Sequence, residues 1–333
     1  MAATYKDIQR ETGLSLATIS KYFNGGSVRP DNAAAIEAAR RSLGFQVNEV
    51  ARSLRTRRSK TVGVLLPELN NGFHLSIIAG VEGELREAGM GVVVSSSGHQ
   101  RGSEAVDFLR GRMVDAIIAV PAAHDGPALR AAGARGLPLV VVDRLLEGLD
   151  TDAVVLDNPG ASQQVVSHLT DHGHRDVGFV GGPDDVWTMR ERRRGFEQAM
   201  ARAGLDVAPQ RVRTGPLTVE FGHAATRALL AGPRPTALHC ANYELTVGSL
   251  IALNEAGVTI PHDISFVGFD GPDLARAFHP RLSVLVQPVH EIAVEAARMV
   301  GRRLLDDGAG HPASRSVLPG RLERGASVTT ARR

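Results

Sequence analysis

The feature that most constrains the fold of this 333-residue chain is a regular alternation of short apolar runs and helical stretches beyond residue 60. Continuous apolar runs indicate strands buried on both faces, and intervening helices indicate parallel sheets covered on each side. Residues 61–333 are numerous enough for two such units, so the sequence predicts a body of two doubly wound parallel-sheet lobes. The runs are Thr61–Leu66, Gly91–Ser95, Ala116–Val120, Leu139–Val142, Val177–Val180, Ala237–Cys240 and Ile264–Gly268. The helical stretches are Leu75–Ala88, Ser103–Gly111, Gly160–Asp171, Glu191–Ala203 and Glu244–Ala256.

The first 45 residues have a different pattern, that of three short helices. Thr4 and Ser15 are placed to cap the first two, and Gly13 breaks the chain between them. The second and third helices are expected over Leu16–Asn24 and Ala33–Leu43. This pattern predicts a small all-α head.

Charge is distributed unevenly along the chain. Residues 1–60 carry 11 Lys/Arg against 5 Asp/Glu, although the net charge of the whole chain is only +2. A basic head on an acidic body suits a module that binds a polyanion, whereas the plainer alternative is a solvated tail. We divide the chain into a head (1–48), a basic linker (49–60) and a body (61–333). Within the body, the N-lobe is expected to comprise about 61–160 plus 290–318, and the C-lobe about 161–289 plus 319–333.

The head carries the pattern of a helix-turn-helix, in which the second helix presents its early residues to base edges. Ile19 and Phe23 are four residues apart and are expected to face the core, which leaves Leu16, Ala17 and Lys21 on the outer face. Lys21 can donate to guanine or to phosphate. A generic three-helix bundle is the alternative. Short polar side chains suited to phosphate oxygens are Ser15, Thr18, Ser20 and Asn24.

Several other classes of protein are disfavoured. The single cysteine, Cys240, excludes disulfides within the chain and cysteine-based zinc sites. No run has the length of a signal-peptide core or a membrane span, so we expect a cytoplasmic protein. His168 and His172 share a helical face, but no third ligand has suitable spacing, so no metal or other cofactor is expected. We find no catalytic constellation and expect a protein that is not an enzyme.

A set of short motifs runs through nearly the whole chain in the order of one known family. The motifs are Lys6–Ile8, Gly13–Lys21, Ala51–Arg55, Thr61–Pro67, His168–Leu169, Gly173–Arg175, Arg190–Arg192, Gly195–Phe196, Ser265–Asp270, Leu282–Ser283 and Gln287–Pro288. On these residues the chain resembles the lactose/galactose repressor (LacI/GalR) family.

The resemblance implies lobes like those of periplasmic binding proteins and base-reading positions at Leu16, Ala17 and Lys21. It also implies a hinge helix over Val50–Arg57 that lies in the minor groove, with Leu54 as a wedge between bases and Ala51, Arg52 and Arg55 beside it. A solvated basic linker is the alternative.

The same resemblance implies a small-molecule site between the lobes. Arginine donors and aspartate acceptors can together grip adjacent hydroxyl groups, which favours a sugar. Alternatives are a surface ion pair for Arg190, a helix cap for Asp270 and simple packing for Trp187. Two departures from the family pattern, Gly72 and Tyr243, indicate a changed pocket. Arg190 matches a position that binds ligand in sugar-responsive members of the family, and Arg192 matches one that contacts ligand in purine-responsive members. Trp187 is a further candidate because it lies three residues before Arg190 and can stack on a sugar face. The other implied effector residues are Phe73, His74, Asn242, Asp270 and Gln287.

We therefore expect a repressor that binds a pseudo-palindromic operator in double-stranded DNA as a homodimer and responds to a small-molecule effector, a sugar or sugar derivative. A regulator that responds to purines or other non-sugars is the alternative. A solute-binding protein would require an export signal and would lack the basic head. A sugar-processing enzyme would require paired carboxylates or a triad.

Overall fold

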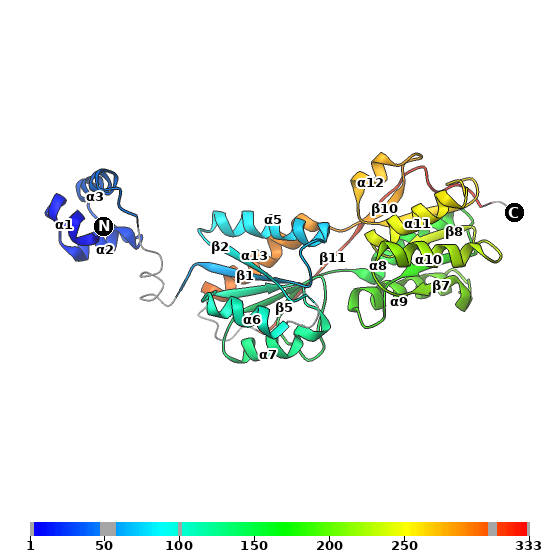
Figure 1. The fold of residues 1–333 in the computed structure, drawn as a ribbon, viewed down its shortest axis with the longest axis horizontal. Helices are drawn as coiled ribbons and strands as arrows, with labels where there is room; N and C mark the ends of the chain where they lie inside the picture. Colours follow the sequence, from blue (N-terminus) through cyan, green and yellow to red (C-terminus); the bar gives the residue numbers. More distant parts are fainter. Residues whose placement is uncertain (1–2, 47–57, 99–101, 306–311, 332–333) are drawn as a thin grey trace. The chain divides into compact units, whose positions relative to one another are not determined.

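The computed structural model describes residues 3–46, 58–98, 102–305 and 312–331 (Figure 1). The chain divides into two compact units: Met1–Lys60, which spans the head and the linker, and Thr61–Arg333, the body. Over the described ranges, no helix combines the length and apolar character that crossing a membrane requires.

Over its described residues, 3–46, the head is a bundle of three helices packed around a small apolar core. Ile8, Ile19 and Ile36 come from different helices, and none of them has exposed surface. Tyr5 stacks on Phe23 with their ring centroids 5.4 Å apart, which closes the bundle beside these isoleucines. The helices are α1 (Tyr5–Thr12), α2 (Leu16–Phe23) and α3 (Pro30–Ser42).

The predicted caps, Thr4 and Ser15, begin α1 and α2. Asp7 accepts hydrogen bonds from both the backbone N–H and the hydroxyl of Thr4, at 2.9 and 2.8 Å. Gly13 ends α1 with a φ of 69°, a conformation that glycine adopts without strain. Ser15 Oγ then accepts from the backbone N–H of Thr18 at 3.2 Å and starts α2.

The third helix begins earlier than the sequence pattern suggested. It starts at Pro30 rather than at Ala33. Proline suits the first helical position because its fixed φ matches the helix and its missing N–H would have no intrahelical partner there. The alanine run therefore marks the middle of α3 and not its beginning.

The body contains two six-stranded sheets, and the predicted fold class is confirmed. The N-lobe sheet has the order β11-β5-β4-β3-β1-β2, and all its neighbouring strands are parallel. Its strands are β1 (Thr61–Leu66), β2 (Gly91–Ser96), β3 (Ala116–Ala119), β4 (Leu139–Val142), β5 (Asp152–Leu156) and β11 (Arg315–Leu318). Its helices are α5 (Gly72–Glu87), α6 (Gly102–Gly111), α7 (Gly126–Ala134) and α13 (Val289–Leu305), with the short η1 (Ala123–Asp125) before α7.

The C-lobe sheet has the order β12-β10-β9-β8-β6-β7 and is parallel except for β12, which pairs antiparallel with β10. Its strands are β6 (Val177–Gly181), β7 (Val212–Thr214), β8 (Ala237–Cys240), β9 (Ser265–Phe269), β10 (Ser283–Val286) and β12 (Arg321–Glu323). Its helices are α8 (Asn158–Asp171), α9 (Trp187–Arg202), α10 (Val219–Leu230), α11 (Tyr243–Glu255) and α12 (Pro272–Ala277), with η2 (Pro209–Arg211) before β7.

Each sheet is covered on both faces, as the continuous apolar runs predicted. In β1, Val62 and Val64 pack against the cluster that includes α5 and α13, whereas Leu65 packs against α6 and α7. Figure 1 shows these two pairs of helices on opposite sides of the N-lobe sheet. Successive side chains of a strand point to opposite faces, so a strand buried on both sides must be apolar throughout.

Five strands were absent from the predicted runs: β5, β7, β10, β11 and β12. Three of these, β7, β11 and β12, lie at sheet edges, where one side of the strand has no neighbour. Edge strands tolerate charged residues, and each of these three contains an arginine. Their sequences therefore lack the apolar run that identified the central strands.

The packing of α8 against α9 depends on a glycine. A methyl group at Gly195 would lie 2.6 Å from the Cα atom of Pro159, a backbone atom in the first turn of α8. The two helices therefore approach too closely for any side chain at this position.

We predict that Gly195→Ala lowers the free energy of unfolding of the body by about 1–3 kcal/mol, because the helices must separate. Denaturant unfolding followed by circular dichroism measures this. The matched control is Gly83→Ala in α5, where nothing lies within 4 Å and alanine should stabilise the helix by up to about 1 kcal/mol. Equal midpoints for the two variants would contradict the prediction.

Candidate functional site

The outer face of α2 is exposed, on the side away from the core of the head. Leu16, Ala17 and Lys21 are all exposed, whereas Ile19 is fully buried. Leu16 has 38% of its surface exposed. This face offers two apolar side chains and one cation to a partner.

The predicted phosphate-contacting side chains are hydrogen-bonded to one another along α2. The hydroxyl groups of Ser15 and Thr18 are 2.9 Å apart, and the amide of Asn24 donates to Ser20 Oγ at 3.2 Å. The predicted hinge contacts, Ala51, Arg52, Leu54 and Arg55, lie outside the described residues and stay predictions.

A groove beside this face adds residues that sequence reasoning did not select. Lys21 and Arg29 contribute positive charge to it, and Ser27 and Asn32 contribute short polar groups. Pro30 could have identified this region in the sequence, because proline is common at the first position of a helix. The N-terminus of a helix exposes backbone N–H groups, which favour anions such as phosphate. The groove is lined by Ala17, Thr18, Lys21, Ser27, Val28, Arg29, Pro30 and Asn32.

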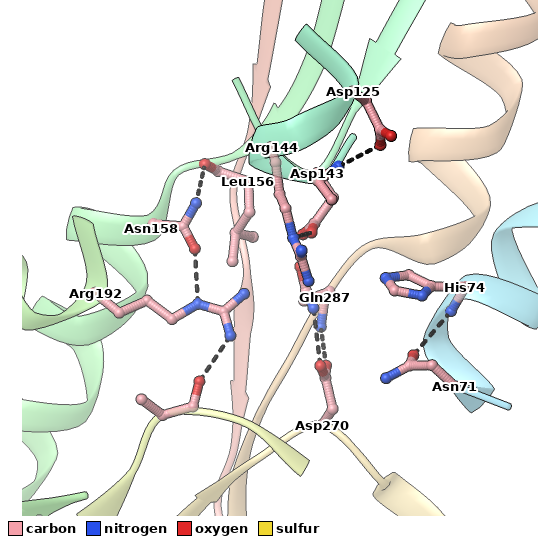
Figure 2. Close-up of polar contacts among 12 residues, drawn as sticks. Asn71, His74, Asp125, Asp143, Arg144, Leu156, Asn158, Arg192, Asp270 and Gln287 are labelled. Atoms are coloured by element: carbon pink, nitrogen blue, oxygen red, sulfur yellow. Dashed lines mark hydrogen bonds and ion pairs between the residues drawn. The ribbon is translucent and has the colours of Figure 1, made fainter. Parts of the chain in front are cut away.

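In the body, polar residues from both lobes follow the carboxyl ends of the strands. Asp143 and Arg144 follow β4, Asp270 follows β9, and Gln287 follows β10. Figure 2 shows these side chains directed toward a common region, with Arg192 facing it from α9. Open α/β sheets bind ligands at this edge.

Arg192 is a buried cation at the centre of the C-lobe contribution. Its exposed fraction is 2%. Nε donates to Asn158 Oδ1 and Nη1 donates to the Ala241 carbonyl, each at 2.7 Å, and the guanidinium carbon lies 3.7 Å from the centroid of the Phe269 ring. Burial lowers the pKa of Arg192 to about 10, so the side chain stays charged at neutral pH. Nη2 has no hydrogen-bond partner among the described residues, which leaves a donor for a ligand.

Asp270 provides the acceptor that complements this cation. Gln287 donates to both carboxylate oxygens, from its backbone N–H at 3.3 Å and from Nε2 at 2.8 Å. Burial raises the pKa of Asp270 to about 6, against the opposing effect of Arg192. Asp270 has a φ of 59°, which is uncommon outside glycine, and Gly271 rather than Asp270 is the N-cap of α12.

The N-lobe contributes His74 and the adjacent pair Asp143 and Arg144. His74 is 2% exposed, and its Nδ1 has no hydrogen-bond partner within the described ranges. Burial lowers the pKa of His74 to about 4, so the ring is neutral at pH 7. Arg144 Nε donates to Asp143 Oδ2 at 3.2 Å. Asp143 and Arg144 also shift the pKa of Arg192, which places these groups of the two lobes within electrostatic reach.

Sequence reasoning missed Asp143 and Arg144. The signal was present, because both residues directly follow the apolar run Leu139–Val142. Asp270, which the family resemblance implied, likewise directly follows its strand. Like Asp270, Asp143 has a positive φ, at 68°.

The two arginines assigned to the effector site differ in their surroundings. Arg190 is exposed, and its Nη1 donates to the carbonyl of Asp184 at 3.1 Å. The structure thus brings Arg192, and not Arg190, together with Asp270. Trp187 is partly buried as the first residue of α9, which begins four residues before the expected Glu191.

Two further candidates have structural roles in this arrangement. Phe73 packs partly buried against the core of the N-lobe. Asn242 caps α11, because its Oδ1 accepts from the backbone N–H of Leu245 at 2.9 Å. The structure brings no three His, Cys, Asp or Glu residues together as a metal site within the part of the chain that it describes.

We predict that burial of His74 makes the free energy of unfolding fall as the solution becomes acidic. An unfolded histidine binds a proton near pH 6.5, whereas folded His74 resists protonation down to about pH 4. Its contribution to the free energy of unfolding is therefore fully present above pH 6.5 and is lost as the pH falls toward 4, by up to about 3 kcal/mol. Unfolding curves of wild type and His74→Gln should diverge over this window. Titratable groups that both proteins share contribute equally, so they cancel when the two free energies of unfolding are subtracted. If the two free energies changed in parallel with pH, the lowered pKa of His74 would be refuted.

Comparison with known proteins gives a consistent result. Residues 166–328 match the family model of a periplasmic binding protein-like domain. The chain is 30% identical over 299 residues to the HTH-type transcriptional repressor CytR of Escherichia coli strain K12, covering 89% of this chain and 88% of that protein. Its fold is similar to that of the lac repressor dimer bound to operator and an anti-inducer, with a TM-score of 0.86, 23% identity and coverage of 99% and 100%. It is also similar to a complex of the transcriptional regulator CelR with cellobiose, with a TM-score of 0.75, 27% identity and coverage of 98% and 99%. The chain belongs to the LacI/GalR family of transcriptional repressors, which are not enzymes.

Proposed function

We propose that this protein is a cytoplasmic repressor that binds a pseudo-palindromic operator as a homodimer and changes its operator affinity when a sugar binds between the lobes. The observation that carries the proposal is the exposed face of α2, where Leu16, Ala17 and Lys21 lie opposite the buried Ile19. A short helix with such a face can enter the major groove, and two copies related by a twofold axis would read two half-sites.

The side chains of α2 and of the groove beside it are assigned different contacts on DNA. Lys21 is the one long donor on the outer face of α2, so it is assigned to a base edge or to a phosphate next to one. Arg29 and the N-terminus of α3 are assigned to the phosphate backbone, which positions the head without reading sequence. Leu54 is assigned to the minor groove as a wedge.

The charged groups around Arg192 support a sugar as the class of effector. Arg192 and Asp270 in the C-lobe, and Arg144 and Asp143 in the N-lobe, supply donors and acceptors in balance. Such a set suits the alternating donor and acceptor character of hydroxyl groups better than it suits a charged ligand. The CelR complex with cellobiose shows a sugar bound to a protein of this fold.

We predict that Lys21→Ala weakens operator binding by about 1–3 kcal/mol and relaxes its sequence preference. The operator is first selected from a randomised duplex library with the full-length protein, and binding is then measured by fluorescence anisotropy at fixed salt. The control is Lys6→Ala, which removes an exposed lysine of α1 and should affect all sequences alike. Unchanged preferences in Lys21→Ala would exclude base reading by this residue, and no enrichment by wild type would exclude the DNA-binding proposal.

We predict that Arg192→Met removes the response to sugar and leaves operator binding without sugar intact. Methionine can still cover Phe269 but cannot donate, so sugar affinity should fall by roughly 10-fold or more. A thermal-shift screen of cellobiose, other sugars, polyols and nucleobases with the full-length protein identifies the effector. The matched control, Arg190→Met, removes an exposed arginine two positions away and should keep the response. Stabilisation by nucleobases alone would reject the sugar class.

A further inference from the structure

Glu244 lies between the N-caps of two helices that belong to different lobes. Asn71 caps α5 in the N-lobe, and Asn242 caps α11 in the C-lobe. Asn71 Nδ2 donates to Glu244 Oε1 at 3.1 Å, and Asn242 Nδ2 donates to Glu244 Oε2. We propose that these three side chains form a clasp that holds the two lobes in their present arrangement beside the effector site.

The side chains of both asparagines are held in place by cap hydrogen bonds other than those that they donate to Glu244. Asn71 Oδ1 accepts from the backbone N–H of His74 at 3.1 Å, and Asn242 Oδ1 accepts from that of Leu245 at 2.9 Å. With each oxygen engaged in a cap, each amide nitrogen is already oriented as a donor. Glu244 therefore receives two charge-assisted hydrogen bonds with little further loss of side-chain freedom in the asparagines.

The carboxylate of Glu244 is partly buried and needs hydrogen-bond donors beside it. Burial raises the pKa of Glu244, and the neighbouring Glu68 raises it further, whereas a backbone hydrogen bond at Glu244 itself, the hydrogen bond from Asn242 and the charge of Arg144 lower it. If the lobes separated, the Asn71 donor would be lost and the carboxylate would need water in its place. The hydrogen bond across the lobes thus favours the present arrangement of the lobes over a more separated one.

The clasp is joined to effector-site residues on both sides. Asn71 caps the helix turn that contains His74. On the other side, the ring of Tyr243 packs against Gly271, the residue after Asp270, where an added methyl group would lie 2.6 Å from Tyr243 Cε2. A ligand that moves His74 or Asp270 would therefore disturb the clasp, and this regulatory consequence, unlike the clasp itself, rests on the proposed function.

The test exchanges the donor and the acceptor across the lobes. Asn71→Asp keeps an oxygen to cap α5 but places a second carboxylate opposite Glu244, so the lobes should separate. Adding Glu244→Gln restores one donor and one acceptor with their positions reversed, so the double variant should close again. The control is Glu255→Gln at the far end of α11, where the carboxylate contacts His223 of the same lobe.

Lobe separation is read from nitroxide labels on the full-length protein by pulsed electron spin resonance. Asp107→Cys in α6 and Asp273→Cys in α12 provide one exposed site in each lobe, and the natural Cys240 is buried. We expect a longer and broader distance distribution in Asn71→Asp, and wild-type distributions in the double variant and in Glu255→Gln. A wild-type distribution in Asn71→Asp, or an equally open double variant, would overturn the clasp.

Operator affinity separates the clasp from its regulatory role. With the DNA selected as above, Asn71→Asp should change operator affinity by roughly 5-fold or more, and the double variant should recover it. Open lobes with unchanged operator affinity would overturn the regulatory role but keep the clasp. Absence of operator binding in wild type would instead count against the proposed function, because the label distances need neither DNA nor effector.

Discussion

The edge of the C-lobe that we propose faces the effector depends on keeping Arg192 charged and buried at the same time. A buried guanidinium is costly unless its donors are paired. Here the partners come from three separate places, Asn158 at the start of α8, the carbonyl of Ala241 after β8 and the ring of Phe269 at the end of β9. Satisfying this one cation therefore fixes two strand ends and two helices relative to one another, and it places Asp270 where it can share a ligand with Arg192.

The two lobes use the same physical device on either side of the shared region. Asp143 and Asp270 directly follow the buried strands β4 and β9, and both have positive φ angles. Because the lobes present similar edges to each other, a small polar ligand can contact both, and a change in their separation changes which contacts are made. That is the linkage a ligand needs to shift a two-state protein.

The central parts of the fold could be predicted because their burial leaves a pattern. Strands such as β3 and β4 are buried on both faces and are apolar throughout. The head was equally readable, since Ile8, Ile19 and Ile36 form its core and Thr4 and Ser15 begin its first two helices. The edge strands β7, β11 and β12 left no such pattern, because a strand with one free edge can carry arginine.

The candidate effector site could be predicted only in part. Asp270 and Gln287 were found through the family resemblance, whereas Asp143, which also follows a strand, was not. Nothing in the run Arg190–Arg194 distinguishes its arginines from one another, and only the rotation of α9 against Phe269 decides which of them is buried. The contact between Asn71 and Glu244 joins residues 173 positions apart and depends on how the two lobes meet.

By itself, the sequence determined the architecture and the chemical character of the chain. Periodicity and composition act locally, so alternating apolar and helical segments specify two parallel-sheet lobes, and clustered cations mark a basic head. Only the tertiary structure decided which polar groups share an environment. The energy of a buried charge such as Arg192, or of a hydrogen bond between the lobes, depends on partners from distant positions in the sequence. A local sequence pattern does not contain the information on which distant residues become neighbours.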